Sequence, residues 1–260
     1  MDEKLSFSKY QGAGNDFILV DNRTGFFDRS DVNLVKRLCD RRFGIGADGL
    51  MLLQDIKNFD FEMVYFNADG REGTMCGNGG RCIVAFARDL GIIAERTAFL
   101  AVDGRHEAKI DEELVDLGMI DVNGTARDGA AYVIDTGSPH YIHFVQNLDN
   151  LPVYEEGYKI RNNDKYRKEG INVNFVQQES DGGYFVRTFE RGVENETLAC
   201  GTGATAAAMA AAVEYSLEGS LEIPIRVLGG QLYISFNRTG EQFTDVRLKG
   251  PAQFVFKGKI

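Results

Sequence analysis

The sequence predicts an α+β protein of two pseudo-symmetric domains from an internal duplication, each a curved, mostly antiparallel sheet around a central helix. The pattern Cys-Gly-x-Gly occurs twice, beginning at Cys76 and at Cys200. Each copy stands directly before a stretch predicted to be helical, and short strand-like segments with turn residues surround each helix. A repeat unit of this length is typical of two similar domains rather than of a solenoid.

The composition is that of an ordinary globular protein. Of 260 residues, 43% are hydrophobic and 26% are charged, which allows one large domain or two smaller ones with separate cores. The net charge of −10 comes without a basic stripe, which argues against a nucleic-acid partner. The sequence has neither an apolar run of about 18 residues nor a signal-peptide pattern at its start. We therefore expect a cytoplasmic protein that does not enter a membrane.

The first half alternates strands with two helices. Its helices are predicted at residues 30–41, with Asp28 or Ser30 as N-cap, and at about 78–90, with Gly91 as C-cap. Its strands are predicted at residues 17–20, 50–53, 61–66, 99–102, 107–110 and 114–119. The turns at 103–104 and 111–112 favour hairpins between the last three strands.

Residues 44–49 match the pattern GxGxxG, which is also found in dinucleotide-binding loops. Such a loop follows a strand and opens a helix. Here a predicted helix precedes the glycines and a strand-like segment follows them. The context therefore argues against a nucleotide site.

The second half repeats this order of elements. Its strands are predicted at residues 131–134, 141–145, 170–176 and 184–189, followed by a hairpin-like tail. Its central helix, at residues 204–213, is nearly all alanine, the best helix former and one that lets other backbones approach closely.

The two halves align in order at a nearly constant offset, between 123 and 131 residues. The aligned pairs are Gly14-Asn15 with Gly137-Ser138, Gly44-Ile45 with Gly170-Ile171, Phe66-Asn67 with Phe189-Glu190, Cys76 with Cys200, Asp103-Gly104 with Gly229-Gly230, and 115–118 with 246–249. Six matches in one order indicate duplication. We predict an N-terminal half at 1–125, a C-terminal half at 126–250 and an active site in the cleft between them. Residues 251–260 are a candidate addition to the first half.

The four cysteines fall into two classes. Cys39 lies on an apolar helical stripe and Cys82 lies inside a predicted helix, so we expect both to be core residues. The sequence has no CxxC and its three histidines lie apart from the cysteines, so no metal site is predicted. Cys76 and Cys200 remain as candidates for chemistry.

A thiol at a helix start lies at the positive end of the helix dipole, which lowers the pKa of a thiol. The backbone N–H groups there bind anions, and those of Gly77, Asn78, Gly201 and Thr202 would hold a carboxylate. With one cysteine on each side, a thiolate could remove a proton from the adjacent carbon and the opposite thiol could return one. The result is inversion without a cofactor. Two buried structural thiols, or a redox-active pair, are the alternatives.

These residues resemble the diaminopimelate epimerase family. The matching segments are Gly12-Ala13-Gly14-Asn15-Asp16-Phe17, Gly44-Ile45-Gly46-Ala47-Asp48, Phe66-Asn67-Ala68-Asp69-Gly70, Cys76-Gly77-Asn78-Gly79, Glu190-Arg191-Gly192 and Ala199-Cys200-Gly201-Thr202-Gly203. The resemblance implies a cofactor-independent epimerase of two pseudo-symmetric domains that interconverts LL- and meso-diaminopimelate in lysine and cell-wall synthesis. It also implies a small amino-acid substrate as partner and a homodimer.

Carried over by position, the resemblance makes Cys76 and Cys200 the acid/base pair. The residues that would hold the reacting carboxylate are Gly77, Asn78, Gly201 and Thr202. The residues that would bind the rest of the substrate are Asn15, Asn67, Asn172, Glu190 and Arg191. His140 and Ser138 would have supporting roles. The distal end of the substrate is itself an amino acid, and Arg191 suits bidentate recognition of its carboxylate.

Two positions depart from the family pattern. Ser138 stands where many members have Asn, and Gly49 stands where some have Gln. The first leaves shorter reach and fewer hydrogen-bonding groups for a distal contact. An isomerase of the same fold that acts on another amino acid, such as a proline-type racemase, is the alternative enzyme, and a redox-sensing protein without isomerase activity is the alternative of another class.

Overall fold

The computed structural model describes residues 4–73 and 75–260. The start of the chain, in which we predict no signal peptide, lies partly outside these residues. Contacts divide the chain into two compact units: unit 1 is Met1–Leu117 with Gly250–Ile260, and unit 2 is Gly118–Lys249. Residues 118–125, which the sequence analysis placed in the first half, belong to unit 2.

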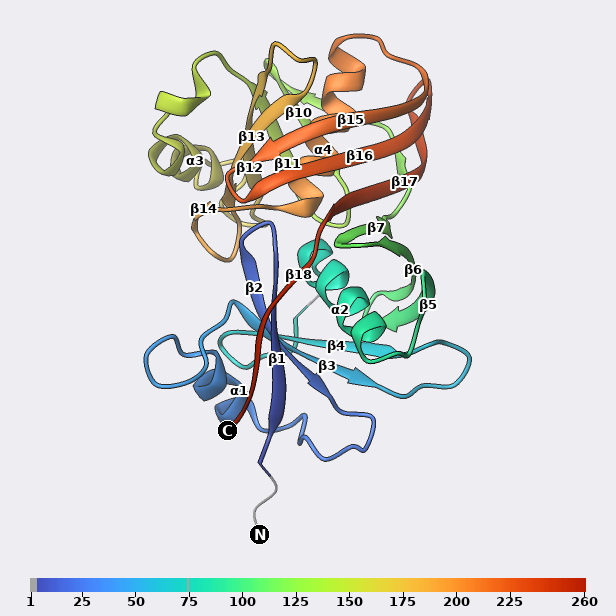
Figure 1. The fold of residues 1–260 in the computed structure, drawn as a ribbon. Coiled ribbons are helices and arrows are strands. Elements are labelled where there is room, and N and C mark those ends of the chain that lie inside the picture. Colours follow the sequence, from blue (N-terminus) through green and yellow to red (C-terminus); the bar gives the residue numbers. More distant parts are fainter. Residues whose placement is uncertain (1–3, 74) are drawn as a thin grey trace. The chain divides into compact units, whose positions relative to one another are not determined.

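Unit 1 is a curved sheet wrapped around helix α2 (Figure 1). In the order in which they pair, its strands are β18 (Gln253–Lys259), β1 (Ser6–Gly12), β2 (Asn15–Asp21), β3 (Gly49–Gln54), β4 (Glu62–Asn67), β5 (Arg96–Ala101), β6 (Gly104–Asp111) and β7 (Leu114–Gly118). Neighbours run antiparallel except β2 with β3 and β4 with β5, which are parallel.

Unit 2 repeats this arrangement around helix α4. In pairing order its strands are β9 (Ala126–Asp128), β10 (Ala131–Asp135), β11 (Pro139–Phe144), β12 (Asn172–Gln178), β13 (Tyr184–Glu190), β15 (Gly219–Val227), β16 (Gly230–Thr239), β17 (Gln242–Pro251) and β8 (Val122–Asn123), with β14 (Asn195–Thr197) also on β13. The parallel pairs are β11 with β12 and β13 with β15, the counterparts of those in unit 1.

A helix connects each parallel pair, as a crossover between parallel strands requires. In unit 1 these helices are α1 (Val32–Cys39) and α2 (Gly77–Asp89), and in unit 2 they are α3 (Val153–Arg161) and α4 (Gly201–Glu214). A short 3-10 helix, η1 (Leu148–Asn150), precedes α3. The same order of elements and pairings in both units confirms the predicted α+β class and the internal duplication.

Strand register fixes which residues of the two units correspond. Leu50 pairs with Phe66 in unit 1, and Val173 pairs with Phe189 in unit 2. Asn67 and Glu190 each follow the paired phenylalanine. The register therefore confirms that Asn67 corresponds to Glu190.

One predicted correspondence was wrong. Phe17 pairs with Gly49, and His140 pairs with Asn172, so Gly49 corresponds to Asn172. This register rules out the match of 44–45 with 170–171. Both segments lie between a helix and a strand, and the glycine with positive φ in the first one is Gly46 (φ 82°), the counterpart in conformation of Gly170 (φ 78°). The sequence alignment matched Gly170 to Gly44, although Gly46 is the glycine that shares its positive φ.

The two central helices consist largely of small residues and are almost entirely buried. In α4 every residue from 206 to 212, six alanines and Met209, has 0% exposure. The predicted end of α2 is confirmed, because Gly91 has φ 73° and its N–H donates to Arg88 O (2.8 Å). Among the helices of the described residues, none has both the length and the apolar character that a membrane crossing needs.

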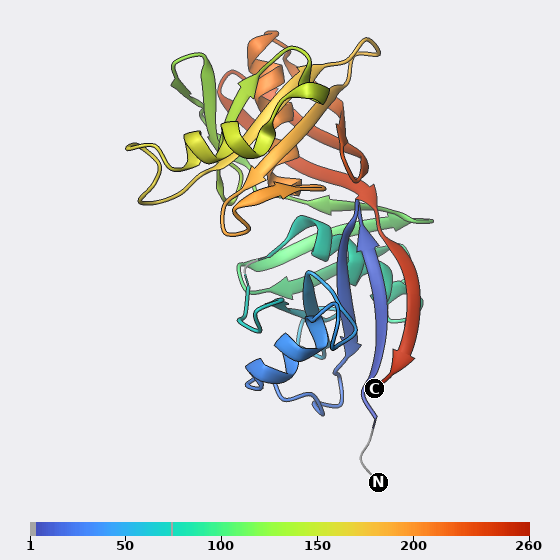
Figure 2. The same cartoon turned by 90° about the vertical axis from the view of Figure 1, so that its left-hand side faces the viewer.

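The outer helices differ from the prediction. In α1 the N-cap is Asp31, whose carboxylate accepts from Leu34 N–H (2.9 Å), and not Asp28 or Ser30. Asp28 instead accepts from the N–H and hydroxyl of Ser30 in a preceding turn. Helix α3, which packs on β12 and β13 (Figure 2), was not predicted. Gly157 interrupts the apolar pattern of this helix. Phe189 leaves no room for a side chain there, because a Cβ at 157 would lie 2.4 Å from Phe189 Cβ.

Candidate active site

Each unit has a cysteine as the N-cap of its central helix. Cys76 precedes α2 and Cys200 precedes α4, both in extended conformation (φ −114° and −120°). The first helical hydrogen bonds run from Gly80 N–H to Cys76 O (2.7 Å) and from Ala204 N–H to Cys200 O (2.9 Å). The N–H groups of the first turn therefore lie beside the thiol at the positive end of the helix dipole, an arrangement suited to an anion.

The other two cysteines are core residues, as predicted. Cys39 and Cys82 are buried, and burial raises the pKa of each thiol to about 12. Both thiols therefore stay protonated at neutral pH. Cys200 is also buried and Cys76 is half-buried, so the helix start, rather than exposure alone, sets them apart.

In unit 1, two asparagine amides connect the start of α2 to β2. Asn78 Nδ2 donates to Asn15 Oδ1 (3.3 Å), and Cys76 Sγ donates to the same oxygen (3.8 Å). Asn15 Nδ2 donates in turn to Asp48 Oδ2 (2.5 Å). The structure thus brings together three residues of the first half that the sequence assigned to the site.

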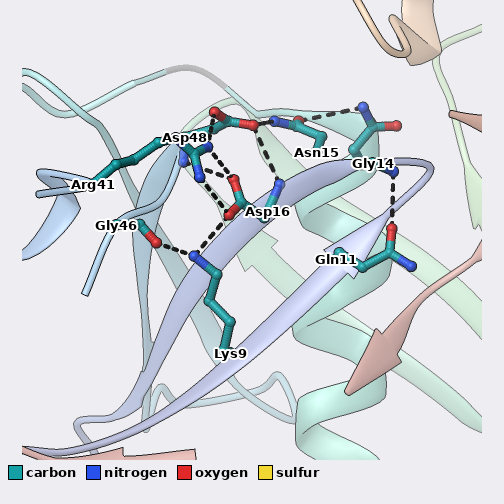
Figure 3. Close-up of polar contacts among 9 residues, drawn as sticks. Lys9, Gln11, Gly14, Asn15, Asp16, Arg41, Gly46 and Asp48 are labelled. Carbon is teal, nitrogen blue, oxygen red and sulfur yellow. Dashed lines mark hydrogen bonds and ion pairs between the residues drawn. The ribbon is translucent and has the colours of Figure 1, made fainter. Parts of the chain in front are cut away.

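Asp48 belongs to a cluster of charged side chains around Asn15 (Figure 3). Arg41 donates to Asp16 (2.6 and 3.0 Å) and to Asp48 (2.7 Å). Lys9, 6% exposed, pairs with Asp16 (2.8 Å) and donates to Gly46 O. Burial raises the pKa of Asp16, but hydrogen bonds from Arg41 and Lys9 outweigh it and lower the pKa to about 2. The cluster therefore keeps its carboxylate ionised.

Arg81 lies inside α2 with 0% exposure. It donates to Asn78 Oδ1 (3.0 Å), Gly77 O (3.2 Å) and Pro251 O (3.4 Å). Burial lowers the pKa of Arg81 from its ordinary value, although a guanidinium stays protonated in proteins. A buried cation thus holds the amide next to Cys76.

The equivalent place in unit 2 has two hydroxyl groups. Thr202 Oγ1 lies 3.5 Å from Cys200 Sγ and 3.4 Å from Ser138 Oγ. Ser138 Oγ accepts from Asn172 Nδ2 (3.2 Å) and lies 3.0 Å from His140 Nε2. The departure at Ser138 is therefore accommodated, because the shorter side chain still reaches three partners.

The partners of His140 define its tautomer. Asn174 Nδ2 donates to Tyr141 O (3.2 Å) and faces His140 Nδ1 (3.1 Å), so Nδ1 accepts and the ring proton is on Nε2. His140 has 0% exposure. Burial, followed by the positive charge of Arg191, lowers the pKa of His140 to about 3. The ring is neutral near pH 7 and donates from Nε2 to Ser138.

The residues assigned to the distal end of a substrate lie where strands end. Asn67 and Glu190 are the last residues of β4 and β13. Glu190 Oε2 accepts from Thr197 Oγ1 (3.0 Å), and the backbone N–H of the exposed Arg191 donates to Asn172 Oδ1 (2.9 Å). Unit 2 thus gathers Glu190, Arg191 and Asn172 at one end of its sheet.

The departure at Gly49 has a steric explanation. A Cβ at Gly49 would lie 2.5 Å from Tyr65 Cε2. Tyr65 therefore fills the space beside Gly49, and the side chain that Asn172 contributes in unit 2 has no counterpart in unit 1.

Three residues of this network, Arg81, Asn174 and Asp48, were not predicted from the sequence. Arg81 is the only charged residue among 77–87, which is a usable signal, because an isolated charge in a buried helix needs a partner. Asn174 lies two residues after Asn172 in a strand and so faces the same side. Asp48 stands in one of the segments that match the family, but nothing in the sequence indicated that it contacts Asn15.

Comparisons with known proteins show the family of this chain. A family model described as diaminopimelate epimerase matches residues 7–120 and 132–255, one stretch in each half of the chain. The chain is 51% identical to a diaminopimelate epimerase of Flavobacterium psychrophilum, over 98% of this chain and 100% of that protein. It is 45% identical to a diaminopimelate epimerase of Chlorobaculum tepidum, over 96% and 98%.

Solved structures share the fold at low identity. A PhzF-family phenazine biosynthesis protein of Bacillus anthracis superposes with a TM-score of 0.78 at 15% identity, covering 99% of both chains. A hydroxyproline epimerase of Agrobacterium vitis gives 0.73 at 12% identity, covering 100% of this chain and 93% of that one. Together with the family model and the full-length relatives, the two cysteine-capped helices lead to one conclusion: the chain belongs to the diaminopimelate epimerase family.

Proposed function

We propose that this protein is a cofactor-independent epimerase that interconverts LL- and meso-diaminopimelate in lysine and cell-wall precursor synthesis. The observation that carries the proposal is the pair of N-cap cysteines, in a chain 51% identical to a diaminopimelate epimerase over nearly its whole length. Cysteine suits the reaction because its thiolate is a base and its thiol an acid at accessible pH.

The reaction takes place at the α-carbon of a bound amino acid. One cysteine, as thiolate, takes the α-proton, and the electron pair left on carbon delocalises into the α-carboxylate. The N–H groups that stabilise this charge belong to Gly77, Asn78, Gly201 and Thr202. The other cysteine, as thiol, gives its proton to the opposite face of the carbon, which inverts the centre. The two cysteines exchange protonation states in each turnover.

The distal end of the substrate sets specificity in this proposal. Arg191 is exposed, its backbone N–H donates to Asn172 Oδ1, and its guanidinium donates to Glu169 O (3.2 Å). In this proposal the guanidinium pairs with the distal carboxylate. Glu190 and the corresponding Asn67 would accept from the distal ammonium. Asn15 and Asn172 would provide further polar contacts to the substrate. His140 and Ser138 would orient Thr202, because Ser138 Oγ contacts both His140 Nε2 and Thr202 Oγ1.

The test is conversion of LL-diaminopimelate, followed by chiral chromatography. We expect the purified protein to form the meso isomer and to leave proline and hydroxyproline unchanged. Cys76→Ala and Cys200→Ala should each lower kcat by about a hundredfold or more, the usual worth of a general acid or base. Cys39→Ala, at a buried core thiol that does not precede a helix, is the matched control and should keep its activity. Absence of meso product, or isomerisation of proline instead, would refute the assignment.

The family resemblance also leads us to propose a cytoplasmic homodimer. A surface that supports dimer formation is β18, where Phe254, Val255 and Phe256 are 50%, 51% and 43% exposed. Apolar side chains gathered on one strand are typical of a surface that another protein covers.

A further inference from the structure

In each unit, two side chains at aligned positions contact each other. The two pairs consist of amides in unit 1 and hydroxyl groups in unit 2. Asn15 contacts Asn78 in unit 1, and Ser138 contacts Thr202 in unit 2, in each case beside the N-cap cysteine. The residues that orient these two pairs differ between the units. Their hydrogen bonds determine whether the pair presents an acceptor or a donor to Cys76 Sγ or Cys200 Sγ.

In unit 1, charged groups fix the direction of the hydrogen bonds at both ends. Arg81 has only donors, so its bond to Asn78 Oδ1 (3.0 Å) turns Nδ2 of that amide toward Asn15. Asp48 has only acceptors when ionised, so the bond from Asn15 Nδ2 (2.5 Å) turns Oδ1 of Asn15 toward Cys76. Cys76 Sγ therefore faces an oxygen that accepts from a thiol and repels a thiolate.

In unit 2 the hydrogen bonds run toward the sulfur. His140 Nε2 and Asn172 Nδ2 both donate to Ser138 Oγ (3.0 and 3.2 Å) and occupy its acceptor positions. The Ser138 hydroxyl is left to donate to Thr202 Oγ1 (3.4 Å), and the Thr202 hydroxyl to Cys200 Sγ (3.5 Å). A hydroxyl donor stabilises a thiolate.

Both central helices have a side chain that donates to the carbonyl of their first residue, but only the side chain in unit 1 is charged. At the offset of the two cysteines, Arg81 aligns with Thr205. Arg81 donates to Gly77 O (3.2 Å), and Thr205 donates to the aligned Gly201 O (3.0 Å). The same carbonyl is held in both halves, by a cation in one and by a hydroxyl in the other.

We propose that Cys76 carries the proton and Cys200 is the thiolate in the substrate-free protein, with Asp48 and Arg81 as positioning residues that act through the asparagine pair. This inference rests on the proposed function and assigns the acid and the base at the start of the catalytic cycle. It makes Asn15, oriented by Asp48, the group that keeps the proton on Cys76.

The charges near Cys76 require a matched control. Arg81 and Cys82 of α2 lie near its sulfur, and Asp48 itself carries a negative charge that disfavours a thiolate. Changing Asp48→Asn removes this charge and also frees Asn15 to turn its N–H toward the sulfur. Asp16→Asn removes an equal charge from the same cluster but leaves Asp48 bound to Asn15. The difference between the two variants isolates the orientation of Asn15.

The measurement is the pH at which iodoacetamide alkylation is half-maximal for each cysteine, read by peptide mass spectrometry on the full-length, substrate-free protein. Cys200 should react at a lower pH than Cys76. Asp48→Asn should lower the value for Cys76 by about one pH unit, the worth of one hydrogen bond to a charged group. Thr202→Val should raise the value for Cys200 by about as much. Asp48→Glu, which keeps an acceptor-only group, should behave like the unchanged protein.

A reversed order of the two cysteines would overturn the assignment, as would equal shifts of Cys76 in Asp48→Asn and Asp16→Asn. Circular dichroism checks that each variant is folded. Because no substrate is present, an inactive protein can still show the predicted order and an active epimerase can show the reverse, so this proposal and the proposed function fail separately.

Discussion

Hydrogen-bond partners distinguish the candidate catalytic cysteines from the packed ones better than burial does. Cys200 is 8% exposed and Cys39 is 3% exposed, a small difference. Cys39 lies in an apolar core that raises the pKa of its thiol, whereas Cys200 precedes a helix and contacts the Thr202 hydroxyl. Position at a helix start, which is visible in the sequence, predicted this division. The partners of each sulfur were not visible, because they come from strands distant in the chain.

His140 gives a prediction about folding stability. Its pKa is lowered to about 3 in the folded protein, against an ordinary value of 6.5. Below pH 6.5 the unfolded chain takes up a proton that the folded protein does not, so the free energy of unfolding falls as the pH drops toward 3. Between pH 7 and 5 this one group should cost about 2 kcal/mol. Urea unfolding at both pH values measures the change.

The control for this prediction is His140→Gln, which cannot titrate. The variant should lose most of the pH dependence between 7 and 5, a window in which Asp16, with its pKa lowered to about 2, stays ionised. An equal pH dependence in both proteins would show that another group is responsible.

At the scale of elements, local signals located the buried helices well and the outer ones poorly. Runs of small residues and Gly91 defined α2 and α4 to within a few residues. Helix α3 was not predicted because Gly157 and polar residues interrupt its apolar periodicity. Contact with Phe189 stabilises it in the folded protein. The repeat could have revealed it, because α1 occupies the same place between the parallel strands of unit 1.

Gly203 shows how closely α4 packs against β12. A Cβ there would lie 2.3 Å from Asn174 Oδ1 and 3.3 Å from Cys200 Sγ. Gly203→Ala should therefore displace Asn174, disturb the His140 network and destabilise the protein by about 1–3 kcal/mol. Thermal unfolding and the rate of meso-diaminopimelate formation measure the two effects. Gly183→Ala, where the nearest atom to a new Cβ is 3.2 Å away, is the control, and an equal loss in both variants would contradict the explanation.

In the whole molecule, the duplication made the fold predictable, and its divergence gives the two cysteine-capped helix starts different hydrogen-bond partners. The matched cysteines and strands were found from the sequence because a repeat compares the chain with itself. Asp48 and Arg81 were not found because their counterparts in unit 2 are different residues, so the repeat gave no signal for them. The correspondence of Asn67 with Glu190, by contrast, was read from the neighbouring phenylalanines and the strand register confirms it.

The proposed homodimer gives a prediction about molecular mass. Light scattering should show about twice the chain mass of 28.9 kDa. Val255→Lys, at a 51% exposed position of β18, should shift the protein toward the monomer because a buried charge is costly. Lys257→Ala on the same strand is the control. A monomeric unchanged protein, or a Val255→Lys variant that stays dimeric, would exclude this surface as the interface.

We propose that two cysteines exchange protons with opposite faces of one carbon. The most direct measurement is the isotope pattern early in the reaction of LL-diaminopimelate in deuterated water, read by mass spectrometry and proton NMR of the separated isomers. Two bases predict that the meso product carries one solvent deuterium at its inverted α-carbon while the remaining LL substrate keeps its hydrogen. Meso product that retains the original hydrogen, or deuterium that enters the substrate as fast as the product, would contradict the two-cysteine mechanism.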